Sequence, residues 1–313
     1  MDLRDLLIKP STRKFIREAR QARDYSLFDF IHGYIYARWT YFYIAVGTGR
    51  HPWSKKLAPL AAWLESKAAP SPSNSNKTSG MTFADTYHGK AVPLEAVKQL
   101  VNIREDIALP DLEQVIPYKR ARDIVLKNPD HLVVIECPCR SAKPNPCLPL
   151  DVCIIVGEPF TGFVMEHNPG KSRWITSQEA AAIIDAEDAR GHVHHAFFKD
   201  AMFGRFYAIC NCCACCCGAI QAHQHGTPML ASSGYLAQID EDSCTACSTC
   251  TSFCQFGALN LASFQMSVDA ALCMGCGVCV DKCPQEAISL RRDESKSAPL
   301  EILSLMQQAS SQV

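Results

Sequence analysis

The spacing Cys-x2-Cys-x2-Cys-x3-Cys occurs twice near the C-terminal end of the chain. The first copy comprises Cys244, Cys247, Cys250 and Cys254, and the second comprises Cys273, Cys276, Cys279 and Cys283. The two copies begin 29 residues apart. Three thiolates presented by one tight turn, with a fourth returning from elsewhere, can satisfy the four corners of a [4Fe-4S] cube. The pattern therefore predicts a pair of such sites and a protein that moves electrons.

These runs resemble those of bacterial two-cluster ferredoxins, in which the last cysteine of each run crosses over to the other cluster. The resemblance implies that one cluster is held by Cys244, Cys247, Cys250 and Cys283. It assigns the other cluster to Cys273, Cys276, Cys279 and Cys254. The residues around each run repeat as well, which predicts a short strand, a cluster loop and a one-turn helix in each copy.

A pair of structural zinc sites is the alternative, because Cys-x2-Cys is also a zinc spacing. Two complete copies of the longer run are much harder to obtain from zinc modules. The first run ends in Cys254-Gln255, whereas the ferredoxin family usually has Cys-Pro at this point. Proline fixes the backbone after the last ligand, so its loss predicts a looser corner that is more open to water.

The chain is much longer than its doubled cysteine run requires. The chain has 313 residues, enough for two or three domains, and the doubled run accounts for only about sixty of them. Eighteen cysteines without a secretory segment after Met1 predict a reducing compartment in which thiols are kept for metal. We therefore expect a cytoplasmic, oxygen-sensitive protein. No nucleotide cofactor is expected, because the chain has neither a G-x-G-x-x-G after a strand nor a G-x4-G-K-[ST] motif.

Residues 1–67 are expected to form a basic, aromatic and amphipathic helical arm. Residues 1–60 carry eleven Lys and Arg against five Asp and Glu, in a chain whose net charge is −1. Eight of the sixteen residues from 28 to 43 are aromatic, and polar residues recur at steps of three and four, which predicts one helix with a wide apolar face. Charged residues such as Asp29 and Arg38 interrupt the block, so a membrane-spanning helix is not expected.

Two locations remain open for this arm. In the first, the helix lies at a membrane surface, with Trp39 and the tyrosines at headgroup level and the upstream arginines on anionic lipid. In the second, it docks on a partner subunit or on the protein's own core. Nucleic acid is not expected as a partner, since the chain has no nucleic-acid fold signature. Residues 68–80 have linker composition, so the arm could reach a membrane or partner while the redox domains stay mobile.

A cysteine-rich α/β domain is expected over residues 81–232. Helices are predicted after Pro93, over residues 118–126 and after Thr176, and a buried strand is predicted over residues 131–136.

The two-cluster ferredoxin domain is expected to cover residues 233–291, and residues 292–313 are expected to form a tail or a frayed helix. The chain as a whole predicts an α+β fold, in which a cysteine-rich mixed domain precedes a ferredoxin-like dicluster domain and follows the helical arm.

The cysteine-rich domain holds ten further cysteines, which are too dense to be core hydrophobes and must bind metal or react. They are Cys137, Cys139, Cys147, Cys153, Cys210, Cys212, Cys213, Cys215, Cys216 and Cys217. The first four suffice in number for one four-thiolate site. Neighbouring cysteines of the later run point to opposite faces of an extended segment and cannot all reach one ion. The later run could supply a second cluster, share ligands with Cys137 and Cys139, or form a larger cluster.

The order of these motifs is Cys-x-Cys-Arg, two more cysteines, a Glu-Ala helix and then Cys-Asn-Cys-Cys-x-Cys-Cys-Cys. It resembles a family of uncharacterised anaerobic ferredoxin-type proteins that carry this domain ahead of a dicluster module. The resemblance covers roughly residues 116–290 and supports an iron-sulfur interpretation. We expect one or two further iron-sulfur clusters here, with zinc as the alternative.

Polar residues near these cysteines have two interpretations each. Arg140 could donate hydrogen bonds to a cluster or offset thiolate charge, or it could form an ordinary surface salt bridge. His192 and His194 could share one face of a strand and bind iron, since imidazole can replace thiolate there. The alternative is that these histidines are polar neighbours of the site or face solvent.

The expected function is that of a non-catalytic, multicluster electron-transfer subunit of an oxidoreductase system in anaerobic metabolism. It would pass electrons between a redox partner enzyme and a membrane or second enzyme, in the cytoplasm or at the inner face of the cytoplasmic membrane. The alternatives are an iron-sulfur catalytic subunit that uses the upstream cysteines, and a cluster-based redox sensor. Enclosed four-cysteine sites would favour transfer, whereas a strongly polar pocket or an odd number of accessible ligands would favour catalysis.

Overall fold

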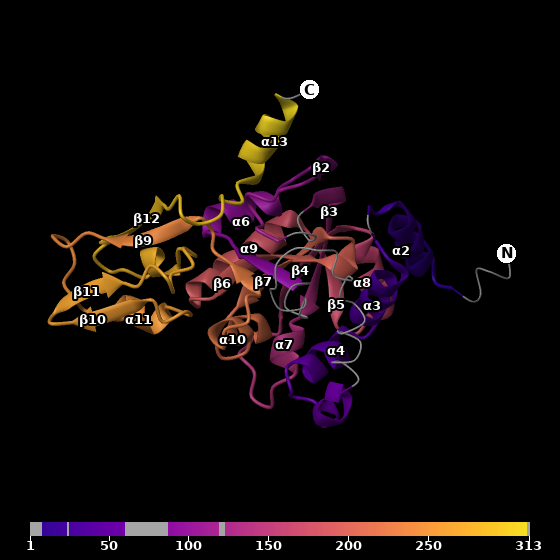
Figure 1. Ribbon diagram of the computed structural model, residues 1–313, viewed down its shortest axis with the longest axis horizontal. Helices are drawn as coiled ribbons and strands as arrows, with labels where there is room; N and C mark the ends of the chain where they lie inside the picture. Colours follow the sequence, from indigo (N-terminus) through magenta and orange to yellow (C-terminus); the bar gives the residue numbers. More distant parts are fainter. Residues whose placement is uncertain (1–7, 24, 60–86, 119–122, 312–313) are drawn as a thin grey trace, which may run out of the picture.

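The computed structural model describes residues 8–23, 25–59, 87–118 and 123–311. They form a central sheet with helices on both faces and a smaller C-terminal lobe beside it (Figure 1). The α+β fold class predicted from the sequence is confirmed. The linker predicted at residues 68–80 lies outside the described residues.

Within the described residues, eight strands form the central sheet. They are β1 (Tyr87–Ala91), β2 (Ile107–Leu109), β3 (Ile124–Glu136), β4 (Asp151–Glu158), β5 (Ser172–Ile175), β6 (Val193–Lys199), β7 (Arg205–Cys212) and β8 (Leu230–Ala231). Their order is β2-β3-β4-β7-β6-β1-β8, and β5 pairs with β3. The sheet is buried on both faces: Val133 and Ile135 of β3 enter one apolar core, and Leu132 and Val134 enter the other.

Helices α6 (Leu94–Leu100), α9 (Ser177–Ala189) and α13 (Ile302–Ser310) cover one face of the sheet. The predictions for α6 and α9 are confirmed: α6 follows Pro93, and Thr176 caps α9 by accepting a hydrogen bond from the Glu179 backbone N–H. Helix α13 lies in the predicted tail. Its Ile302 is fully buried in the core, so this part of the tail belongs to the fold.

The opposite face is covered by α7 (Pro138–Ser141), α8 (Phe160–His167), α10 (Gly218–Gln224) and three helices of the N-terminal arm. The arm helices are α2 (Pro10–Gln21), α3 (Leu27–Arg38) and α4 (Thr40–Gly47), drawn in indigo in Figure 1. Phe15 of α2 is fully buried, and its ring centroid lies 5.1 Å from that of Phe163 on α8. Residues 10–47 thus dock on the protein's own core, which is one of the two locations left open by the sequence. None of the described helices has the length and apolar character needed to cross a membrane.

The single helix predicted for the aromatic block is wrong, because the block forms α3 and α4. Trp39 separates them with backbone angles of φ −126° and ψ 44°, outside the helical region. Helix α3 begins with a capping box, in which the Ser26 hydroxyl accepts from the Asp29 N–H and the Asp29 carboxylate accepts from the Ser26 N–H. The break turns α4 toward the cysteine-bearing end of β3, where α4 contacts α7.

The helix predicted over residues 118–126 is wrong at its C-terminal end, and residues 119–122 lie outside the described residues. Residues 124–126 begin β3 and pair with β2, where Ile107 lies opposite Leu126. The side chains of Ile124 and Leu126 are fully buried in the core, so tertiary burial decides the conformation here. The strand predicted over residues 131–136 is confirmed as the end of the longer β3.

The C-terminal lobe contains two copies of a strand, a loop and a short helix. The first copy is β9 (Tyr235–Ile239), α11 (Thr249–Phe253) and β10 (Leu259–Ala262). The second is β11 (Gln265–Val268), α12 (Val278–Asp281) and β12 (Ile288–Arg292). Strands β9 and β12 pair antiparallel, as do β10 and β11, so each small sheet joins one strand from each copy.

Candidate metal centres

The eight cysteines of the C-terminal lobe line two separate hollows. One hollow is lined by Cys244, Cys247, Cys250 and Cys283. The other is lined by Cys254, Cys273, Cys276 and Cys279. Each hollow thus combines three thiols of one run with the last thiol of the other, which is the grouping that the ferredoxin resemblance implies. We call the first quartet the outer set and the second the inner set.

Equivalent backbone hydrogen bonds reach the crossing thiols of the two copies. The Ala258 N–H donates to Cys254 Sγ at 3.2 Å, and the Ala287 N–H donates to Cys283 Sγ at 3.3 Å. Such donors stabilise sulfur charge and raise the potential of a cluster bound there.

The two sets differ in exposure. Burial raises the pKa of Cys276 in the inner set to about 12, whereas Cys247 in the outer set is exposed. The Thr249 hydroxyl beside Cys247 lowers the pKa of that thiol. The outer set is therefore the one that offers a thiol to solvent.

Six of the ten upstream thiols form a closed circuit, which we call the six-thiol ring. Side-chain interactions link neighbouring members in the order Cys210, Cys153, Cys137, Cys139, Cys217 and Cys212, and an electrostatic interaction joins Cys212 to Cys210. The sheet creates this grouping, since Cys153 on β4 lies directly opposite Cys210 on β7. Cys210 and Cys212 lie two residues apart on β7, so their side chains share one face.

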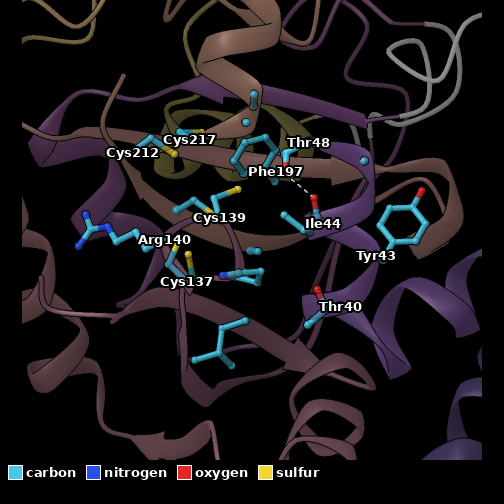
Figure 2. Close-up of a pocket in the computed structure, with 18 of the residues that line it drawn as sticks. Thr40, Tyr43, Ile44, Thr48, Cys137, Cys139, Arg140, Phe197, Cys212 and Cys217 are labelled. Atoms are coloured by element: carbon cyan, nitrogen blue, oxygen red, sulfur yellow. Dashed lines mark hydrogen bonds between the residues drawn. The ribbon is translucent and has the colours of Figure 1, made fainter. Parts of the chain in front are cut away.

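The six-thiol ring borders a cavity of about 430 Å³. Helices α3 and α4 supply the opposite wall through Tyr36, Thr40, Tyr43, Ile44 and Thr48. Figure 2 shows the labelled cysteines of the ring on one side and the arm residues Thr40, Tyr43, Ile44 and Thr48 on the other. The aromatic arm therefore forms one wall of the chamber that these thiols line.

The remaining four upstream thiols gather at a second point, which we call the four-thiol cluster. It consists of Cys147, Cys213, Cys215 and Cys216, whose sulfur atoms all lie within 4.8 Å of one another. Cys147 thus lies with thiols of the later run, although Cys137, Cys139, Cys147 and Cys153 would suffice in number for one site. Chain order could not show this, because Cys147 sits on a loop that reaches across to the turn after β7.

Two segments of the C-terminal lobe match the 4Fe-4S binding domain family, over residues 237–260 and 266–289. These matches support two [4Fe-4S] clusters in this lobe. They indicate iron-sulfur electron transfer. No curated protein matches the chain. The outer and inner sets fit the matched domains, because each provides four thiols around one hollow.

Arg140 forms a buried ion pair rather than the surface salt bridge considered from the sequence. It is 1% exposed and donates to the Glu187 carboxylate at 2.5 Å and to the Asn211 carbonyl at 3.2 Å. Burial disfavours its charge, but Glu187 outweighs burial and raises the pKa of Arg140 above its ordinary value. Because Arg140 also lines the cavity, it places a permanent positive charge behind the thiols.

His192, just before β6, and His194, on β6, are both buried, so of the two alternatives to iron binding they take the place of polar neighbours and do not face solvent. His192 Nδ1 lies 2.7 Å from Glu187, and His194 Nδ1 lies 2.6 Å from the side-chain oxygen of Asn211. These contacts make them polar neighbours of the site that brace Glu187 and Asn211.

Lys199 is a buried residue of the chamber that the sequence did not predict. Lys199, at the end of β6, is fully buried, lines the cavity, and places its Nζ 4.9 Å from the ring centroid of Tyr36. Burial lowers its pKa to about 7. The Tyr36 hydroxyl in turn lies 2.8 Å from that of Tyr207, so the chamber carries proton-exchanging groups beside its thiols. A lysine at the end of an apolar strand gave no sequence signal for this position.

Gln255 joins the C-terminal lobe to the upstream cysteine loop. Its side-chain oxygen accepts from the Ala214 backbone N–H at 2.7 Å, and its side-chain nitrogen donates to the Gly191 carbonyl at 2.8 Å. The Gln224 side chain donates to the Gln255 carbonyl at 3.0 Å. Phe256 and Met274 continue the contact within the same apolar core that contains the six-thiol ring.

Proposed function

We propose that this protein is a multicentre iron-sulfur electron carrier, in which the ferredoxin-type lobe is held against a chamber that contains a further cluster. The observation that carries the proposal is the position of the inner set. Cys254 and Cys276 pack against the same apolar core as Cys137 and Cys217 of the six-thiol ring. Gln255, next to Cys254, is bonded to the loop that carries the upstream cysteines.

Each part of the chain has a distinct task in this proposal. A [4Fe-4S] cluster supplies reversible one-electron transfer when it is bound. The outer set presents the exposed Cys247 to a redox partner, and the inner set faces the upstream domain. The six-thiol ring provides more than the four thiolates that one cube needs, and helices α3 and α4 form one wall of the cavity beside it.

The physiological setting that we propose is an oxidoreductase system of anaerobic metabolism. The partner enzyme would dock at the outer end of the C-terminal lobe, where Cys247 is exposed.

A catalytic role for the chamber is the second candidate, and the size of the cavity favours it. The hollows at the two ferredoxin quartets have volumes of about 10 and 20 Å³, whereas the chamber has about 430 Å³. This leaves space beyond the thiols for a small molecule. Lys199, with its pKa lowered by burial, and the Tyr36–Tyr207 hydroxyl pair could exchange protons with such a molecule.

We further propose that the outward face of α3 docks on an anionic membrane surface. Leu27, Ile31, Ile35 and Trp39 recur every four residues and are 74%, 49%, 39% and 50% exposed. We call these residues the outer apolar stripe. Three of them lie on α3 and Trp39 follows its last residue, and the net positive charge of residues 1–60 suits anionic headgroups.

Anaerobic iron and acid-labile sulfide analysis, with EPR of the reduced protein, tests the proposed carrier. Two cubes account for about eight irons per chain, and we expect the wild-type protein to exceed this number. The Cys137→Ser/Cys153→Ser/Cys210→Ser variant leaves three thiols in the ring, too few for a cube, and should return to about eight irons while keeping the signals of the two ferredoxin clusters. A wild-type value of about eight would refute the additional cluster. Binding of cyanide to the additional signal would favour the catalytic candidate over simple transfer.

A further inference from the structure

We propose that the four-thiol cluster holds a single zinc ion, separate from every iron-sulfur site of the protein. The ligands are Cys147 from the loop before β4 and Cys213, Cys215 and Cys216 from the turn after β7. The proposal goes beyond electron transfer, because zinc has no redox chemistry and acts here as a structural clamp.

The sulfur atoms of the four-thiol cluster lie close enough together to bind one metal ion. Cys147 Sγ lies 3.1 Å from Cys215 Sγ and 3.8 Å from Cys213 Sγ. Cys215 Sγ lies 3.2 Å from Cys213 Sγ and 3.7 Å from Cys216 Sγ. Four thiolates bound tetrahedrally at about 2.3 Å around one ion stand about 3.8 Å apart. The separations of 3.7 and 3.8 Å match this value, the other two are shorter, and all four sulfur atoms lie within 4.8 Å of one another, which leaves room for one ion but not for a cube.

A cube does not fit this quartet. Each thiolate of a [4Fe-4S] cluster binds its own iron, so the iron atoms stand between the thiolates and spread them to roughly 6 Å. The four-thiol cluster can be compared with the outer and inner sets, which lie in segments that match the 4Fe-4S binding domain. In the part of the chain that the structure describes, the four-thiol cluster is the group of possible metal ligands drawn together within 4.8 Å. The thiols of each ferredoxin quartet instead line one hollow and are not drawn together within this distance.

Positive side chains surround the quartet. Lys143 Nζ donates to the Cys215 carbonyl at 2.5 Å, and Arg50 donates to the Cys216 carbonyl at 2.9 Å. A divalent ion with four thiolates carries a net charge of −2, and these two cations lie where they offset it. Arg50 also donates to the Cys139 carbonyl at 2.9 Å, so it joins the zinc loop to the six-thiol ring.

The clamp holds the loop that receives the ferredoxin-type lobe. Ala214, whose N–H bonds Gln255, lies between the ligands Cys213 and Cys215. A zinc ion here would fix that N–H relative to β7 and to the loop that carries Cys147. The zinc site thereby sets the position of the inner ferredoxin set without taking part in electron transfer.

Metal analysis of the anaerobically purified full-length protein tests the proposal. After dialysis against EDTA, we expect about one zinc per chain, and zinc X-ray absorption should show four sulfur ligands at about 2.3 Å. Absence of zinc, or one sulfide-free iron in its place, would overturn the proposal. This measurement needs no variant, so a folding defect cannot obscure it.

Two matched substitutions assign the site. Cys147→Ser should lose most of the zinc and keep the iron and sulfide content of the wild-type protein. Cys153→Ser, in the six-thiol ring, is the control and should retain the zinc. If Cys147→Ser instead lost about four irons and kept its zinc, the quartet would be an iron-sulfur site and the proposal would fail. The iron count of the wild-type protein tests the additional cluster independently of this result.

Discussion

The Gln255 side chain accepts a hydrogen bond from the Ala214 N–H at 2.7 Å, and this contact joins the two cysteine systems of the protein. The sequence predicted a looser corner at Gln255, because the ferredoxin family usually has proline after this cysteine. The structure gives the glutamine a different task. Proline has no side-chain donor or acceptor, whereas glutamine bonds Ala214 and Gly191 of the upstream domain at once.

Replacement of Gln255 by Ala should loosen the contact between the two halves of the protein. The Ala214 N–H loses its acceptor, and each such loss costs about 1–3 kcal/mol when the group stays buried. Hydrogen exchange should show faster exchange at Ala214, with the iron content unchanged. Gln238→Ala is the control, since Gln238 is an exposed glutamine on β9. Equal exchange at Ala214 in the wild type and in Gln255→Ala would show that the lobe is held by other contacts.

Gly33→Ala should dislodge α3 and open the chamber. A Cβ at Gly33 would lie 2.0 Å from the Ala201 backbone oxygen, which also accepts a hydrogen bond from the Tyr25 hydroxyl. No backbone atom tolerates this approach, so the helix must move away. We expect a lower melting temperature and faster bleaching of visible absorbance in air.

Gly47→Ala is the matched control for this substitution. A Cβ at Gly47, at the end of α4, meets nothing within 4 Å. Alanine also favours the helix over glycine by up to about 1 kcal/mol, so this variant should be as stable as the wild type or more stable. Equal behaviour of the two variants would contradict the role of α3 as the wall of the chamber.

Local signals in the sequence were sufficient where one segment determines its own structure. The doubled cysteine run predicted its two strand–loop–helix copies, and Thr176 marked the start of α9. Grouping of the upstream thiols depends on strand pairing instead. Cys153 meets Cys210 because β4 pairs with β7, and no spacing rule encodes that register. For the same reason the sequence left open which thiols lie beside Cys147.

The position of the aromatic arm also depends on contacts with residues far away in the sequence. Its composition suits a membrane surface and a protein core equally, and Phe15 and Tyr36 are buried because the sheet offers an apolar face. Lys199 was missed because a single lysine gives no signal until the surrounding helices close over it.

Stability at acidic pH should depend on Glu18, which fastens α2 to the sheet. Its carboxylate accepts from Lys127 Nζ at 2.7 Å and from Arg205 Nη1 at 3.1 Å. Burial raises the pKa of Glu18, but the two cations outweigh burial and the net shift is below the ordinary value of 4.5. Because its pKa is lower in the folded state than in the unfolded state, Glu18 stabilises the folded protein at pH values above 4.5. This contribution is lost as the pH falls through the pKa of the folded state.

Glu18→Gln tests this dependence. The variant should lose about 2 kcal/mol of unfolding free energy at pH 7, because Lys127 and Arg205 keep their charges without the partner. Urea unfolding between pH 6 and about pH 3 should show a shallower decline for Glu18→Gln than for the wild type. Parallel pH profiles would show that the ion pairs of Glu18 contribute little in solution.

The proposed docking of α3 on a membrane predicts that the protein binds anionic vesicles. The full-length protein should float with phosphatidylserine vesicles at low salt and bind less as salt screens the basic residues of the arm. Truncation of the arm is unsuitable, because Phe15 and Tyr36 belong to the core. Leu27→Gln/Ile31→Gln/Trp39→Gln changes exposed side chains of the outer apolar stripe and should abolish flotation while leaving the fold intact. Phe264→Gln is the control, since Phe264 is 94% exposed on the C-terminal lobe. If the wild type stays with the soluble fraction at low salt, the stripe is a protein-docking surface instead.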